Sequence, residues 1–421
     1  MRKVFLTAFL FLITSMTLAG QDIYEAGVRA NGMLGAYTAL ANDASSIFYN
    51  PAGLAKANGI EVIGGATFIS PRTTFRNTTT ELGPYGLEQK MDKQTFTIPN
   101  FYGSYQIQEG LTAGLGVYVP FGLGTRWDDD WIGRASSIET NIETVFINPA
   151  IGYTLPDFGI GDIHIGAGLT ILASGSVQQR RAITTFVPEG EFNLEGTLDS
   201  PGYGYNIGLK YEPVDLITFG FTYRSGVKAE FSGDAEFTNT PDELFTNTGG
   251  STSIDLPASF VGAIAVHPSE QLTVEFDYVW WGWSSFDALV INFDEAMLGL
   301  DPQLEQPQDQ TTNIRDYKDV YQLRLGSEYR DAFVDGLTLR AGFTYDKTPI
   351  REVRVDPTLP EADRIQWALG VSYTVLPELT IDAGYIHIRA NERTIEDPEA
   401  DLRGVYNTLA YLPSIGFTLK L

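Results

Sequence analysis

The most regular feature of the chain is an alternation of apolar and polar residues over segments of roughly ten positions, the length that a tilted strand needs to cross a bilayer. In one segment Ile163, Ile165 and Ala167 alternate with His164 and Gly166. The same alternation returns at three later places: residues 272–278, 321–329 and 337–346. Successive side chains of a strand point to opposite faces, so each segment is predicted to be a strand with one apolar face.

Fourteen segments are predicted as strands, and an even number is what bacterial single-chain membrane barrels show. They lie at residues 60–69, 95–107, 111–120, 142–155, 161–173, 202–212, 215–231, 255–267, 271–285, 318–330, 336–347, 363–374, 378–391 and 411–421. The last strand ends in apolar Leu421, as expected of a strand that closes a barrel. The predicted fold class is therefore all-β, a 14-stranded antiparallel transmembrane β-barrel over residues 60–421.

The links between the predicted strands alternate in length. Short links rich in Gly, Pro, Asp or Asn are typical of tight turns; they lie at residues 109–110, 156–159, 212–215, 268–271, 331–336 and 376–377. Long polar links lie at residues 71–94, 126–141, 181–201, 232–254, 286–317 and 347–363. This alternation indicates an up-and-down barrel with short periplasmic turns and long extracellular loops.

A soluble sandwich or a propeller would show the same strand pattern with its apolar face inside. Two features favour the membrane barrel. The apolar faces often end in Tyr or Trp, which gather at membrane interfaces, and Trp280, Trp281 and Trp283 are expected in this girdle. The chain also holds 43 Gly, 21 Tyr and 25 Phe, and aromatic residues favour strands.

The first residues predict the compartment. Arg2 and Lys3 precede an apolar run at residues 4–13, and Ala19 offers the small residue of a cleavage site. Residues 1–19 are therefore predicted to be a secretory signal peptide. No later segment offers the unbroken run of about 18 apolar residues that a membrane helix needs. We expect the mature barrel in the bacterial outer membrane.

Composition narrows the partners and the chemistry. The net charge of −25, from 28 basic and 53 acidic residues, argues against a nucleic-acid partner, because there is no basic patch to neutralise phosphate. The chain has no cysteine and therefore no disulfide framework. Its three histidines are dispersed, and no nucleophile elbow, Walker or dinucleotide fingerprint occurs. We predict no cofactor, no metal site and no enzyme activity.

Residues 20–59 precede the first strand and do not alternate. Met33 and Tyr37 are spaced like one face of a short helix, and Asn50-Pro51 is a turn signal. The segment could fold inside the barrel as a plug, or it could be a disordered or periplasmic arm. The residues alone leave both alternatives open.

The stretch from Asn31 to Leu54 resembles the hatch of the FadL/TodX/OmpP1 family of outer-membrane long-chain fatty acid and hydrocarbon transporters, which carries an N-P-A motif, here Asn50-Pro51-Ala52. Further matches to the family follow in order: Tyr223-Arg224-Ser225, Phe231-Ser232-Gly233-Asp234, Leu256-Pro257-Ala258, Trp283-Ser284-Ser285-Phe286, Tyr317-Lys318-Asp319-Val320-Tyr321 and Tyr345-Asp346-Lys347-Thr348-Pro349-Ile350. Each match is short, but together they cover nearly the whole mature chain.

The resemblance implies a barrel plugged by residues 20–59, the hatch. It also implies a transporter whose extracellular loops capture a hydrophobic small molecule, either a long-chain fatty acid or an aromatic hydrocarbon. The ligand would enter the lumen and leave sideways through a gap at a kinked third strand. Pro120, Phe121 and Gly122 are the candidate lateral gate, because Pro120 cannot donate and Gly122 weakens a strand. Equally, Pro120 could simply begin the next loop.

A carboxylate head group would need a buried cation. By strand parity Arg324 and Arg340 face the lumen, and Lys318 lies near a strand start. Candidate ligand-binding residues are Arg180, Arg181, Lys318, Arg324, Arg340 and Asp346, of which Arg180, Arg181 and Asp346 rest on the resemblance. The plainer alternative is charge pairing within the lumen, for example with Glu328.

Two functions of other classes remain open beside transport. A FadL-like barrel could be a structural or secretion-associated component that binds partner proteins. A barrel enzyme of the phospholipase kind needs an outward-facing Ser–His pair, which the sequence does not offer. Outer-membrane lipid and lipopolysaccharide are the expected surroundings, and we expect a monomer.

Overall fold

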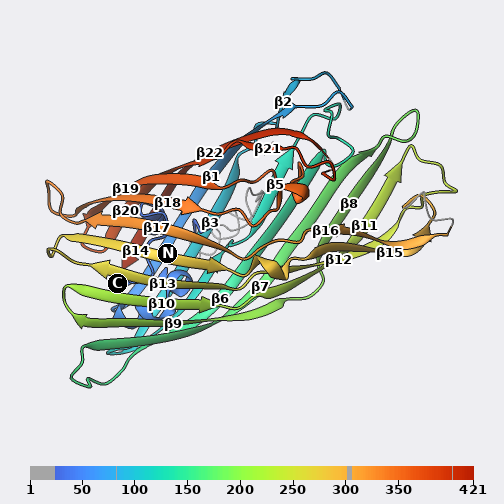
Figure 1. The fold of residues 1–421 in the computed structure, drawn as a ribbon. Helices are drawn as coiled ribbons and strands as arrows, with labels where there is room; N and C mark the ends of the chain where they lie inside the picture. The colour runs from blue at the N-terminus through green and yellow to red at the C-terminus, as the bar shows by residue number, and fades with distance from the viewer. Residues whose placement is uncertain (1–23, 82, 301–305, 401) are drawn as a thin grey trace.

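The computed structural model describes residues 24–81, 83–300, 306–400 and 402–421, and its strands close into one antiparallel barrel (Figure 1). The strand pairing starts at β1, passes through 14 strands and returns to β1 through β22, as predicted. The signal peptide predicted at residues 1–19 lies outside the described residues.

The ring consists, in order of pairing, of β1 (Ile60–Asn77), β3 (Phe96–Gln108), β4 (Leu111–Tyr118), β6 (Glu139–Thr154), β7 (Asp162–Ile183), β9 (Gly202–Val214), β10 (Ile217–Arg224), β13 (Ser259–Val266), β14 (Leu272–Trp281), β17 (Val320–Tyr329), β18 (Leu337–Asp346), β19 (Arg364–Leu376), β20 (Leu379–Ala390) and β22 (Gly404–Lys420). Each of these strands overlaps one predicted segment. The structure therefore confirms both the number of strands and their order.

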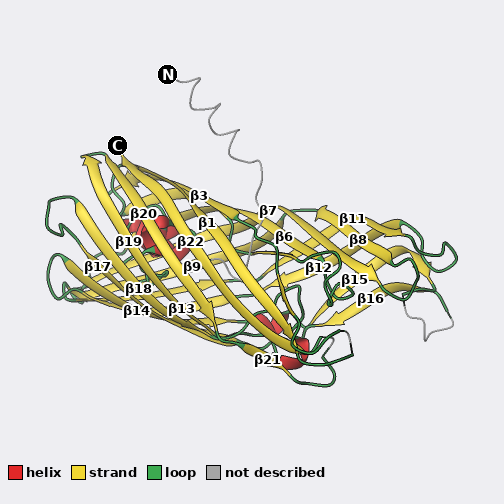
Figure 2. Ribbon diagram, turned by 90° about the horizontal axis from the view of Figure 1, so that it is seen from above, coloured by secondary structure: helices red, strands yellow, loops and turns green. Residues whose placement is uncertain are grey.

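The long links are more ordered than predicted. The far half of β7 continues into a sheet that extends beyond one end of the ring (Figures 1 and 2). This extension contains β8 (Gly190–Leu198), β11 (Val227–Thr238), β12 (Thr248–Leu256), β15 (Ala288–Met297) and β16 (Gln308–Ile314). The prediction of plain loops at residues 181–201, 232–254 and 286–317 was therefore wrong, because cross-strand pairing orders these polar segments.

The single strand predicted at residues 215–231 is two strands. β10 pairs with β9 and β13 in the ring, whereas β11 pairs with β8 and β12 in the extension. Apolar residues continue at odd positions on both sides of Ser225-Gly226, so the sequence gives no sign of the change in strand partners.

Shorter elements connect the strands: β2 (Glu88–Lys90), β5 (Gly122–Arg126), β21 (Arg393–Ile395), η2 (Trp283–Ser285) and η3 (Glu352–Arg354).

The barrel wall is apolar outside and polar inside. Along β17, Tyr321 and Leu325 are 37% and 49% exposed, whereas Gln322 and Arg324 are 3% and 1% exposed. A soluble protein would bury the first pair and expose the second. This polarity is the one that a strand between lipid and a polar lumen requires.

The N-terminal segment (residues 24–59) lies inside the ring (Figure 2). It contains α2 (Val28–Asn31), α3 (Ser46–Tyr49) and η1 (Pro51–Lys56). Its fit depends on glycine in the wall: a Cβ added at Gly166 would lie 2.2 Å from the carbonyl carbon of Pro51, and one at Gly208 would lie 2.0 Å from Oδ1 of Asn50. Among the described residues, no helix is long and apolar enough to cross a membrane.

Candidate functional site

Carboxylates of the wall hold the backbone of the N-terminal segment. The two carboxylate oxygens of Glu275 accept hydrogen bonds from the N–H groups of Ala39 and Leu40, each at 2.7 Å. Glu61 accepts from the N–H of Ala44 at 2.6 Å. Hydrogen bonds to a charged acceptor are shorter and stronger than neutral ones, so these contacts fix the segment to β14 and β1.

A network of ion pairs forms a second tie. Arg29 of α2 contacts Asp43 and Glu328, each at 3.0 Å. Arg340 contacts the same Glu328 at 2.7 Å and lies 3.9 Å from Asp382. Arg340 therefore faces the lumen as predicted, but its charge is used in pairing.

The predicted hatch residues lie against β7 and β9. Asn50 is fully buried; its side chain donates to the carbonyl oxygens of Thr38 at 2.8 Å and Leu209 at 3.2 Å. Its Oδ1 accepts from the N–H of Ala52 at 3.2 Å and so caps η1, which begins at Pro51. The N-P-A motif thus combines a helix cap, a helix start and a contact with the wall.

Above the segment, on the side of the extension, lies a luminal cavity. Its apolar wall includes Leu34, Ile386, Ile388 and Leu412. Arg324 lines it as well. The cavity therefore combines hydrocarbon surface with a buried cation.

Arg324 makes no ion pair within 4.0 Å among the described residues. Its guanidinium lies 3.5 Å from the centre of the Tyr24 ring and donates to the carbonyl oxygen of Gly35 at 3.3 Å and to Gln322. Asp277 lies opposite on β14. A guanidinium that is 1% exposed and held mainly by neutral groups is a suitable partner for an anionic head group.

A carboxyl group in the wall of this cavity makes the charge of the cavity depend on pH. Glu361, in the link before β19, lines the cavity and lies 3.3 Å from Arg364. Burial raises the pKa of Glu361 to about 7, against the opposing effect of Arg364. The charge of the cavity therefore changes near neutral pH.

An apolar cavity lies between the ring and the extension. Phe121, Leu256 and Trp283 are among its lining residues, and Leu359 lines both this cavity and the luminal one. Arg315 also lines it and pairs with an aspartate of the link before β19 at 2.5 Å. The two cavities therefore adjoin.

The tryptophans predicted for the membrane girdle divide between the two faces. Trp281 and Trp283 are 5% and 4% exposed, and their rings lie 6.2 and 6.3 Å from that of Phe121. The girdle prediction was therefore wrong for these two. Trp281 follows the inward parity of β14, and Trp283 lies in η2, where the strand has ended; only Trp280 retains the outward position.

The candidate gate coincides with a break in the ladder. The pairing of β3 with β4 stops at Phe101 and Val117, while β3 continues to pair with β1 as far as Phe96. Residues 119–121 belong to no strand, and β5 pairs with β6. In the described ranges, no strand therefore pairs with residues 96–100 on the β4 side. A small pocket lies between Tyr24, Pro120 and Phe121 on one side and β10, β13 and β14 on the other.

The other predicted ligand residues lie apart from the cavities or are already paired. Arg180 pairs with Asp129 at 2.6 Å and Glu191 at 3.0 Å. Arg181 lies over the Phe192 ring. The remaining two are Lys318, which is exposed, and Asp346, which contacts Arg364 at 2.6 Å. Of the six predicted residues, only Arg324 lines the luminal cavity.

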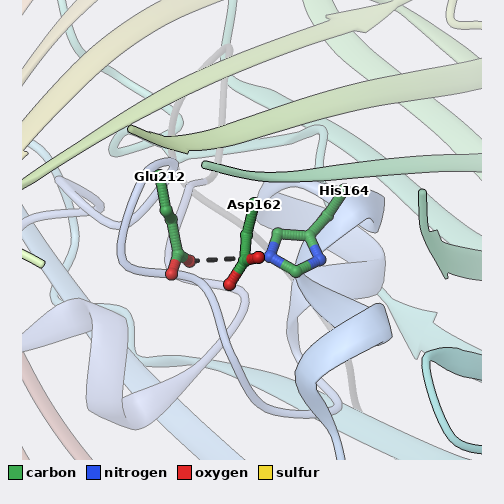
Figure 3. Close-up of side chains that lie close together, drawn as sticks. All are labelled: Asp162, His164 and Glu212. Carbon is green, nitrogen blue, oxygen red and sulfur yellow. Dashed lines mark ion pairs between the residues drawn. The ribbon is translucent and has the colours of Figure 1, made fainter. Parts of the chain in front are cut away.

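Pairing of β7 with β9 assembles a cluster that the sequence did not reveal (Figure 3). Possible ligand atoms of Asp162, His164 and Glu212 all lie within 4.8 Å of one another. Glu212, however, is contacted by Lys56 at 2.7 Å and Lys210 at 3.3 Å. We therefore assign the cluster to holding η1 against β9 rather than to binding a metal.

Comparison with known proteins shows which family the chain matches. A family model described as outer membrane protein transport protein (OMPP1/FadL/TodX) matches residues 10–420. A putative outer membrane protein of Neisseria meningitidis serogroup B is 26% identical over 95% of this chain and 92% of its own. The long-chain fatty acid transport protein of Escherichia coli K12 is 25% identical over 90% of this chain and 93% of its own.

Solved structures share the fold. The crystal structure of a FadL homologue from Pseudomonas aeruginosa superposes with a TM-score of 0.79 at 21% identity, covering 96% of this chain and 100% of the other. The toluene transporter TodX of Pseudomonas putida gives a TM-score of 0.69 at 15% identity, with 97% and 100% covered.

Proposed function

The chain belongs to the OMPP1/FadL/TodX family of outer membrane transport proteins, and from this we propose that it takes up long-chain fatty acids or aromatic hydrocarbons and releases them sideways into the membrane. It is a barrel of the bacterial outer membrane. The N-terminal segment acts as the hatch. The family description, a transport protein, supports a transporter rather than an enzyme. The ring closes within one chain and needs no second copy to complete it, which is compatible with a monomer.

The observation that carries this proposal is the chain of apolar spaces leading inward from the extension. The apolar cavity adjoins the luminal cavity at Leu359. The luminal cavity in turn adjoins the pocket behind Pro120 and Phe121, because Tyr24 lines both. The apolar side chains along this series favour a hydrophobic ligand by about 25 cal/mol per Å² of its surface kept from water.

The opposite end of the lumen supports a sideways exit. At the end with the short turns, the space between the hatch and the wall is lined by polar and charged side chains, including Asp43, Glu61, Glu328 and Lys420. An apolar ligand gains nothing there, and the ion pairs around Arg29 would have to break to let it pass. The unpaired stretch of β3 offers an exit towards lipid instead.

A photoreactive fatty acid tests the route. We expect irradiation of the bound protein to label residues of the luminal cavity and, after longer incubation, residues 96–100 and 119–121, as mapped by mass spectrometry. Labelling of the polar space beside Glu328 without labelling of the ladder break would instead assign the exit to the periplasm. A neutral aromatic probe should label the same series if the protein transports hydrocarbons.

A further inference from the structure

Two exposed arginines share one row of the outer barrel wall. In the ladder, Arg389 of β20 lies opposite Leu409 of β22, which lies opposite Arg72 of β1. The three strands run side by side (Figure 1). Directly opposed residues point to the same face, and neighbouring strands lie about 4.8 Å apart, so the two arginine backbones are roughly 10 Å apart.

The rows beneath the arginines fix their height in the membrane. The next row towards the short-turn end holds Trp367, His387 and Tyr411, with ring centroids 5.3 and 5.4 Å apart in succession. Further down, the outward side chains include Leu369 and Ile415, which are 57% and 56% exposed. Tyr and Trp gather where hydrocarbon meets head groups. The arginines therefore lie at the level of the outer-leaflet head groups.

Both arginines are free to bind an external anion. Among the described residues, neither Arg72 nor Arg389 forms an ion pair or a side-chain hydrogen bond, and both are exposed. The chain has 53 acidic and 28 basic residues, so carboxylates are abundant. Other exposed cations pair with them, as Lys228 does with Glu230 at 2.7 Å.

The basic character continues up the same face. Arg76 lies four positions beyond Arg72 on β1, and Lys90 of β2 lies opposite the residue between them. The acid nearest to these two along the ladder is Glu88, which lies opposite Arg76 and 3.6 Å from Lys90. Asp363 lies two positions from Ile365, the residue opposite Arg389, and is paired with Lys347 at 2.8 Å. The face therefore keeps an excess of positive charge when Glu88 and Asp363 are both counted.

We propose that Arg72 and Arg389 form a binding site for the phosphate groups of a phosphorylated lipid of the outer leaflet. Guanidinium groups bind phosphate through paired, charge-assisted hydrogen bonds. The acyl chains of the same lipid would lie along the aromatic row and the apolar rows beneath it. Charge and height in the membrane thus select one occupant, an anionic lipid with a phosphorylated head group.

Lipid binding to the purified full-length protein tests this site. Native mass spectrometry would compare diphosphorylated lipid A with the same lipid after removal of its phosphates. We expect the phosphorylated form to bind more tightly by about tenfold, since each cation near a charged leaflet contributes on the order of a few-fold in affinity. The double variant Arg72→Gln, Arg389→Gln should bind the two lipids equally.

Two controls separate the site from general effects of charge or folding. The variant Arg330→Gln removes an exposed arginine at the short-turn end and should leave the preference intact, and the double lysine variant should keep part of it. A heat-dependent shift on a gel shows that each barrel is closed. Equal binding of both lipids by the unaltered protein, or an unchanged preference in the double glutamine variant, would overturn the proposal. Displacement of lipid A by millimolar inorganic phosphate would also overturn it, because it would assign the site to free phosphate.

Discussion

At the scale of single residues, the luminal cavity is lined by four acidic or basic side chains, Glu25, Arg324, Glu361 and Arg364, of which Arg324 and Glu361 give separate tests. Arg324 provides a buried cation that neutral groups hold in place. Glu361 provides a carboxylate whose charge depends on pH near neutrality. The remaining lining is largely apolar, so head-group chemistry and tail burial can be tested separately.

Replacing Arg324 with glutamine should weaken binding of oleate by about tenfold or more, since a hydrogen bond to a charged group contributes roughly 1.5–3 kcal/mol. Toluene has no head group, so its binding should stay within about twofold. Equilibrium binding of labelled ligands to the purified protein measures both. The variant Lys318→Gln is the matched control because Lys318 is exposed away from the cavity. An equal loss of oleate binding in both variants would show that Arg324 has no special role.

The charge of Glu361 predicts a dependence on pH. Its pKa is raised to about 7 by burial, so folding around the neutral form contributes stability that is present below the ordinary pKa of a glutamate, about 4.3, and is lost as the pH rises through about 7. An alkyl sulfonate, which stays ionised throughout, should therefore bind a few-fold more tightly at pH 6 than at pH 8.

The variant Glu361→Gln should bind the sulfonate equally at the two pH values, because the amide carries no charge at either. Isothermal titration calorimetry would report both affinities. A pH dependence that persists unchanged in the variant would place the titrating group elsewhere.

At the scale of elements, the ring was predictable and the extension was not. Each ring strand has one lipid-facing side, so its alternation is complete, as in β17 and β18. In the extension, β11 buries Ala229, Phe231 and Phe237 on one face, but acidic residues on the other made residues 232–254 resemble a loop. The sequence also does not give the register between paired strands. The proximity of His164 and Glu212 across β7 and β9 is therefore seen only in the structure.

The break beside β3 should respond to changes that extend the ladder. The double variant Pro120→Val, Gly122→Val restores a backbone donor and favours a strand. We expect uptake by cells to fall several-fold while binding in the luminal cavity of the purified protein is kept, since neither residue lines that cavity. Phe158→Val, an exposed site in a short turn, is the control. Unchanged uptake in the double variant would contradict a gate at this position.

The hatch should loosen when its wall contacts are removed. Glu275→Ala deletes the two hydrogen bonds to Ala39 and Leu40 and leaves both N–H groups unsatisfied, at a cost of about 1–3 kcal/mol each. Planar bilayer recordings should then show more frequent opening to small ions. Glu270→Ala, in an exposed turn, should record like the unaltered protein. Equal conductance in both variants would count against a hatch anchored by Glu275.

At the scale of the whole molecule, the barrel is asymmetric along its axis. Apolar cavities lie towards the extension, and charged side chains line the space at the short-turn end. This difference between the two ends explains how a plugged barrel can pass apolar molecules while blocking the flow of water and ions through the lumen. The alternating link lengths predicted the two unlike ends, but only the folded chain shows that their interiors differ in chemistry.

The most direct test of the central claim is uptake of radiolabelled oleate and of toluene by cells that lack other members of the family, with and without this chain. The account predicts faster initial uptake of at least one of the two ligands when the chain is present. It also predicts unchanged uptake of a polar solute of similar size, because the lumen is plugged. Equal uptake of both hydrophobic ligands with and without the chain would contradict transport.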